Sequence, residues 1–154
     1  MHREDKARTI VCSAERVINA DPALVWALVA DPMRVGEWAP FEVVGYMGTE
    51  LPKRGQIVFL RTRRWRPGSR QRRVEVQEWE AGTMYRCEMQ PDGGGTSVGF
   101  EVGVTPEAMG GEIATRVRLI QRLESPGSSA RLLRWYLARR LERRLDRIAK
   151  ASVA

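Results

Sequence analysis

Two tyrosines and one glutamate are the side chains whose type and surroundings best suit work on a small molecule. Tyr85 and Tyr136 fall on elements expected to face an apolar interior. There a hydroxyl either orients a bound ligand or belongs to a buried ring whose oxygen reaches water. Glu78, beside Trp79, is a candidate proton-transfer group if it faces a cavity, and a solvated carboxylate if it does not. Glu78 and Tyr85 are therefore the two candidate catalytic residues.

Two arginines near the C-terminus are candidates for meeting an anion. Arg140 and Arg144 lie close to an apolar stripe at helical spacing. Turned inward, either guanidinium would bind a ligand carboxylate or phosphate. The stripe consists of Leu133, Leu137, Leu141, Leu145 and Ile148.

The sequence lacks the patterns of common metal, cofactor and nucleophile sites. His2 is the only histidine, so a zinc site has no suitable ligand set. There is no nucleotide-binding glycine loop and no Ser-His-Asp pattern, and the glycine run at residues 93–95 predicts a turn. We therefore expect neither a metal nor a cofactor. Cys12 and Cys87 are expected to be buried free thiols.

Two very short helices are predicted directly after a first strand at residues 9–19. Asp21 and Asp31 each fit a helix N-cap, because each precedes a proline that suits the first helical position. Pro40 ends the second helix. Helices of about two turns are unstable alone, so both must be held by packing.

The middle of the chain has a hydrophobic period of two, which predicts six strands. Short connections between them favour an antiparallel meander, with a loop at residues 106–111. On the last strand Ile113 shares one face with Val117, Leu119 and Leu123. The predicted strands are residues 42–48, 55–64, 73–80, 83–90, 96–105 and 113–123.

Residues 128–151 predict one long amphipathic helix. Seven antiparallel strands curl under their own twist, and one such helix covers the concave face. The expected fold class is therefore α+β. One domain at residues 9–154 follows a tail at residues 1–8 that we expect to be disordered.

The net charge of +7 is concentrated in two patches. Residues 61–73 contain seven arginines and no acid, and residues 131–150 are also strongly basic. One interpretation is an anionic lipid surface, and the other is a solvated arginine-rich face; nucleic acid is the less favoured partner. No apolar signal segment opens the chain, so we expect a cytoplasmic protein. The candidate lipid contacts are Arg63, Arg64, Arg139 and Arg143.

The segment after the first strand carries a family resemblance. Residues 17–40, VINADPALVWALVADPMRVGEWAP, resemble the opening of the START-like (SRPBCC) superfamily, in its polyketide cyclase/dehydrase branch. The resemblance extends more weakly over the whole chain. The matching positions are Ala20, Pro22, Val25, Trp26, Asp31, Arg34, Trp38 and Pro40.

This resemblance implies a helix-grip fold with an internal cavity for an apolar ligand. Some members cyclise or dehydrate polyketides, and others bind or carry lipids, sterols or hormones. The aromatase/cyclases of the branch hold substrate oxygens with a cavity arginine, where this sequence has Glu78. Trp38 is either core or cavity mouth, and Phe59 and Phe100 are either cavity wall or core. The expected ligand contacts are Trp38, Phe59, Tyr85, Phe100, Leu133, Tyr136 and Leu137.

Three functions follow as hypotheses. The first is binding of a small hydrophobic or amphipathic ligand between the sheet and the C-terminal helix. The second is a polyketide cyclase or dehydratase acting on a bound poly-β-keto chain. The third is binding of anionic membrane surfaces through the arginine patches.

Overall fold

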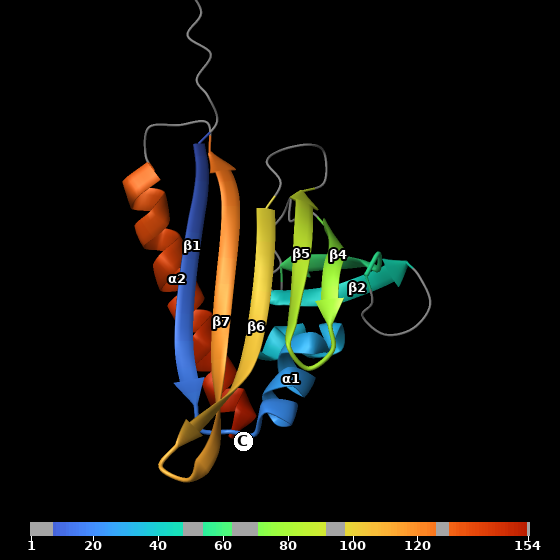
Figure 1. Cartoon of the computed structure of the whole chain (residues 1–154). Coiled ribbons are helices and arrows are strands. Elements are labelled where there is room, and N and C mark those ends of the chain that lie inside the picture. The colour runs from blue at the N-terminus through green and yellow to red at the C-terminus, as the bar shows by residue number, and fades with distance from the viewer. Residues whose placement is uncertain (1–7, 48–53, 63–70, 92–97, 126–129, 154) are drawn as a thin grey trace, which may run out of the picture.

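The computed structural model describes residues 8–47, 54–62, 71–91, 98–125 and 130–153. The turn predicted at residues 93–95 lies outside these ranges, as do Arg63, Arg64 and the expected tail apart from Arg8. Figure 1 shows the arrangement of the elements. Their bounds are β1 Arg8–Ile18, α1 Pro22–Ala30, the 3-10 helix η1 Pro32–Glu37, β2 Phe41–Met47, β3 Ile57–Thr62, β4 Arg72–Glu80, β5 Met84–Pro91, β6 Val98–Met109, β7 Glu112–Ser125 and α2 Ala130–Ser152.

The two short capped helices form where the Asp-Pro pairs predict them. The Asp21 carboxylate accepts a hydrogen bond from the Ala23 backbone N–H at 2.8 Å, and Asp31 accepts one from Met33 at 2.9 Å. The second element, η1, has the tighter 3-10 geometry that is common in short pieces. Packing holds α1 to the core through Val25, Leu28 and Val29.

The seven strands form one antiparallel sheet in the order β1-β7-β6-β5-β4-β3-β2. Consecutive strands from β2 to β7 are neighbours, which confirms the predicted meander. The sheet is strongly curled: β2 runs across the direction of β1 and β7 (Figure 1). Since β1 and β2 are its two opposite edges, α1 and η1 carry the chain from one edge to the other.

The loop predicted at residues 106–111 is wrong in extent. β6 and β7 stay paired out to Met109 and Glu112, and only Gly110 and Gly111 form the turn. Both glycines have positive φ, 55° and 86°, as a tight two-residue hairpin turn requires. Ile113 is therefore 66% exposed, although its alternation assigned it to the inner face. The hairpin tip carries it past the end of the core.

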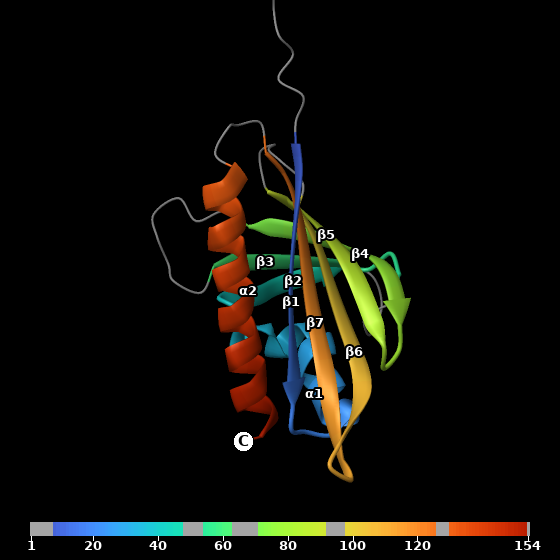
Figure 2. The ribbon, with the colours of Figure 1, turned by 60° about the vertical axis from the view of Figure 1, so that its left-hand side comes forward.

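The long helix α2 lies along β1, and the sheet curves around it (Figure 2). Its apolar stripe is buried from Leu137 onward, with Leu137, Leu141, Leu145 and Ile148 all at most 3% exposed, while Leu133 is partly exposed. On the outer side Arg16 of β1 forms ion pairs with Glu142, at 3.3 Å, and with Asp146. Cys12 and Cys87 are free and buried, as expected. The curved sheet with its covering helix confirms the α+β helix-grip fold.

Candidate functional site

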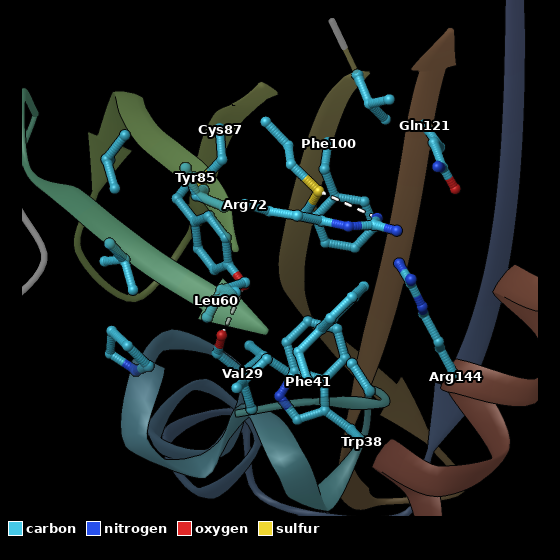
Figure 3. A pocket seen from close by; sticks show the side chains of 18 of the residues that line it. Val29, Trp38, Phe41, Leu60, Arg72, Tyr85, Cys87, Phe100, Gln121 and Arg144 are labelled. Carbon is cyan, nitrogen blue, oxygen red and sulfur yellow. Dashed lines mark hydrogen bonds between the residues drawn. The ribbon is translucent and has the colours of Figure 1, made fainter. Parts of the chain in front are cut away.

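A cavity of about 280 Å³ lies between the concave face of the sheet, α2 and the α1–η1 connection (Figure 3). Most of its lining is apolar, which is typical of small-molecule sites. The sheet contributes inward residues of β3, β4, β5 and β6, because alternate side chains of a strand point to the same face. Apolar lining residues from these strands and from α1 include Val29, Val58, Leu60, Val74, Val76, Met89 and Val98.

Stacked aromatic rings build two walls of the cavity. The Trp38 and Phe100 ring centroids are 6.2 Å apart and 21° from parallel. Trp79 and Tyr85 stack with centroids 5.5 Å apart, and Trp26 packs against both rings. These pairs join η1 to β6 and α1 to β4 and β5, so they fix the short helices at the rim.

The Tyr85 hydroxyl has a partner inside the protein. It donates a hydrogen bond to the Val29 carbonyl oxygen at 2.6 Å. Val29 belongs to the last turn of α1, whose carbonyls have no intrahelical partner. Burial raises the pKa of this hydroxyl well above its ordinary value, so it stays protonated. Tyr85 therefore holds α1 against the sheet as well as lining the cavity.

Six of the seven expected contacts line the cavity. Tyr136 does so from an exposed position, 53% accessible, while Leu137 is buried. Phe59 does not, and its expected place is corrected: Val58 and Leu60 point inward, so Phe59 between them faces the outer side of β3. The residues that line it are Trp38, Tyr85, Phe100, Leu133, Tyr136 and Leu137.

Glu78 lies on the outer face of β4, which corrects its candidacy as a cavity carboxylate. Val74 and Val76 face the cavity, and simple alternation would place Glu78 there too. A register irregularity between Val76 and Glu78 inserts Gln77 as an unpaired residue. This bulge reverses the alternation, so the next inward residue is Trp79. Glu78 is half exposed and pairs with Arg86 at 2.8 Å.

Three guanidinium groups reach the cavity, from Arg72 on β4 and from Arg140 and Arg144 on α2. Arg144 is only 7% exposed. Burial, and next the positive charge of Arg140, lower the pKa of the Arg144 guanidinium to about 9. Burial also lowers the pKa of Arg140. From the sequence, an inward turn of Arg140 or Arg144 was one alternative; in the structure both line the cavity.

Several buried polar atoms around the cavity have no hydrogen-bond partner among the described residues. They are the Trp38 indole Nε1, the Gln121 Oε1 and the Arg144 Nε. Buried polar groups are usually paired, so atoms like these mark places where a ligand or water fits. Arg72 and Gln121 also line the cavity and were not among the residues predicted from the sequence. Their signal was the alternation itself, since Arg72 precedes Val74 by two positions and Gln121 follows Leu119 by two.

The described residues contain no cluster of three or more acidic, cysteine or histidine side chains arranged to hold a metal ion. Within the same ranges, no helix has the length and apolar content needed to cross a membrane.

The profile of the family described as polyketide cyclase / dehydrase and lipid transport matches residues 9–153. Among curated proteins, none matches the sequence.

Several solved structures have the same fold. SA2116 from Staphylococcus aureus, a protein of unknown function, has a TM-score of 0.74 at 10% identity, over 95% of this chain and 94% of its own. CalU16 from Micromonospora echinospora has a TM-score of 0.62 at 16% identity, over 94% of this chain and 76% of its own. DynU16, a putative protein in the dynemicin biosynthetic locus, has a TM-score of 0.62 at 19% identity, over 91% of this chain and 46% of its own. At these identities the similarity concerns the fold alone.

Proposed function

This chain belongs to the polyketide cyclase / dehydrase and lipid transport family, and we propose that it binds a small hydrophobic or amphipathic molecule in the cavity between the sheet and α2. The cavity itself carries this proposal. It is about 280 Å³ in volume, mainly apolar, and bounded by the sheet, α2 and the α1–η1 connection. Binding would be driven by burial of apolar surface, at about 25 cal/mol per Å² before the costs of association are subtracted.

The proposed ligand contacts follow from the lining. Trp38 and Phe100 offer a stacked aromatic wall to an apolar body. The buried Leu137 also lines the cavity. Leu133 is partly exposed and Tyr136 is largely exposed, so these two form the part of the lining nearest the solvent. We place the protein in the cytoplasm as part of this proposal, where both buried thiols stay reduced.

Native mass spectrometry of the protein purified from its own host tests the proposal. A stoichiometric adduct that denaturing analysis identifies as an apolar or amphipathic molecule is the expected result. Protein that stays empty under every gentle condition, and that takes up no amphiphile added at micromolar concentration, would contradict it.

A polyketide cyclase or dehydratase in the same cavity is the alternative. The observation in its favour is the set of donors, Trp38 Nε1 and the guanidinium groups of Arg72 and Arg144, which suit carbonyl and enolate oxygens. Efficient acid–base catalysis needs a group with a pKa near the working pH. The pKa values of Tyr85 and Arg144 lie above that range, which is why binding is the leading proposal. Incubation with a poly-β-keto thioester decides: cyclised product above the uncatalysed rate supports the enzyme, and binding without turnover opposes it.

The outer face of α2 supports a second contact, with anionic lipid surfaces. Trp135 is 56% exposed, and the Arg139 guanidinium lies 5.0 Å from its ring centroid. Arg143 is also exposed and stands four residues after Arg139, on the same side of the helix. An exposed tryptophan among cations suits the boundary between headgroups and acyl chains.

A further inference from the structure

The cavity collects positive charge without a matching negative one. Arg72, Arg140 and Arg144 all line it, while Asp31 is the one carboxylate among the described lining residues. The Asp31 Oδ1 already accepts the Met33 backbone N–H at the start of η1. Within the described ranges none of the three arginines forms an ion pair.

Buried positive charge without a partner lowers the stability of the folded protein. A buried charge is normally paired, because removing it from water without a partner is costly. Arg144 lies over the rings of Phe41 and Phe100, at 5.9 and 5.3 Å from their centroids. These rings attract the flat face of the guanidinium but accept none of its in-plane N–H groups. Its Nε accordingly has no partner among the described residues.

Arg72 has a comparably weak set of contacts. Its guanidinium lies 5.3 Å from the Phe41 centroid, and it donates to the Met89 thioether sulfur at 3.5 Å. A thioether is a weak acceptor, so this contact leaves most of the donor capacity of Arg72 unused.

The unused donors face a common space. Figure 3 shows the guanidinium ends of Arg72 and Arg144 pointing toward each other from the strand side and the helix side of the cavity, with Gln121 beside them. Tyr85 and Leu60 lie on the other side of the same view. The cavity is therefore polar and positive at one end and apolar at the other.

We propose that the cavity binds an amphipathic anion, with its carboxylate or phosphate group held by Arg72, Arg140 and Arg144 and its apolar body against Tyr85, Leu60 and the neighbouring valines. An oxyanion supplies both the missing countercharge and the in-plane acceptors that the aromatic rings do not offer. The proposal rests on the proposed function and adds the charge and chemical class of the ligand.

Matched ligands test the charge. Decanoate, decyl phosphate, decanol and decyltrimethylammonium carry the same apolar chain and differ in the head group. Each is titrated into the whole protein below its critical micelle concentration or, for decanol, below its solubility limit, and binding is followed by calorimetry and by tryptophan fluorescence. We expect decanoate or decyl phosphate to bind ~10–100-fold more tightly than decanol, the range typical of hydrogen bonds to a charged group. The cation should bind more weakly than decanol.

Variants of one helix test the position. Arg144→Met should lose ~10-fold or more in affinity for the anion that binds best, while its affinity for decanol is unchanged or higher. Arg144→Lys should retain part of the anion preference, since it keeps the charge but not the planar fork. Arg134→Met is the control, because Arg134 is an exposed arginine on the same helix. It should behave as the unsubstituted protein.

Each outcome separates the two proposals. If decanol binds as tightly as both anions, the anion site is wrong while the hydrophobic cavity stands. If no ten-carbon amphiphile binds, both proposals fail for ligands of this size. If inorganic phosphate alone binds as tightly as decyl phosphate, the site takes a free anion and the amphipathic part is wrong. Should Arg144→Met not fold, the ligand series on the unsubstituted protein still decides.

Discussion

Replacing Arg144 by methionine should make the ligand-free protein more stable. Arg144 is 7% exposed and its guanidinium has no carboxylate partner among the described residues, so its charge opposes folding. Methionine keeps an unbranched apolar side chain at this position and removes the charge. The substitution thus separates the energetic effect of the charge from that of the side-chain volume.

The magnitude follows from the lowered pKa of Arg144, about 9. Relative to a usual arginine pKa above 12, this corresponds to roughly 4 kcal/mol of destabilised charge at about 1.4 kcal/mol per pH unit. Loss of the cation–π contacts with two rings offsets about 1–2 kcal/mol of it. The expected gain in the free energy of unfolding at pH 7 is therefore about 2–3 kcal/mol, a Tm increase of ~4–12 °C.

The gain should also depend on pH, with a definite sign. The folded-state pKa lies below the unfolded one, so the destabilisation is fully present below pH 9 and shrinks as the pH rises above it. Urea unfolding of both proteins, freed of any ligand, at pH 7 and pH 10 measures the two differences. The reasoning is refuted if Arg144→Met is less stable at pH 7, or if its advantage grows at pH 10. Arg134→Met should leave the stability within about 0.5 kcal/mol, as expected for an exposed site.

Three further substitutions have direct readouts. Tyr85→Phe removes the hydrogen bond to the Val29 carbonyl and should cost about 1–2 kcal/mol of unfolding free energy in chemical denaturation, whereas Tyr136→Phe, at an exposed tyrosine, should cost almost nothing. Asp21→Ala removes the N-cap of α1 and should lower the unfolding free energy by about 1 kcal/mol; Asp21→Asn keeps a capping oxygen, so an equal loss in both would contradict the cap. Trp135→Ala should reduce flotation with anionic liposomes, with neutral liposomes as the control, and unchanged flotation would remove the lipid contact from the outer face of α2.

Much of the fold could be predicted because its local chemistry is unambiguous. The Asp-Pro pairs at residues 21 and 31 specify two helix starts, and a Leu-rich stripe at helical spacing specifies the face of α2. Six strands with short connections leave few alternatives to a curled antiparallel meander. The family resemblance in residues 17–40 then identified the helix-grip arrangement, which the fold and the family profile confirm.

The wrong predictions fall on strands where the alternation of inward and outward residues is ambiguous or interrupted. β3 contains four consecutive apolar residues from Ile57, so either alternation satisfies the pattern, and Phe59 was assigned to the wrong face. On β4 the extra residue Gln77 reverses the alternation without any glycine or proline to signal it. The inward turn of three arginines is a tertiary property, because the same residues suit a solvated face equally well until the sheet curls over them.

The pairing of β1 with β7 has a consequence for how the chain reaches its native state. Ile10 lies opposite Leu123, so the first strand finds its partner only after nearly all of the sheet has been synthesised. Until then β1 has no strand to pair with, while β2 to β7 can pair one after another as hairpins of consecutive strands. Contacts of such long sequence separation slow folding, because loop-closure entropy is lost before they form. We expect docking of β1 to be the late, rate-limiting event in folding, with α1 and η1 as the tether that brings it back.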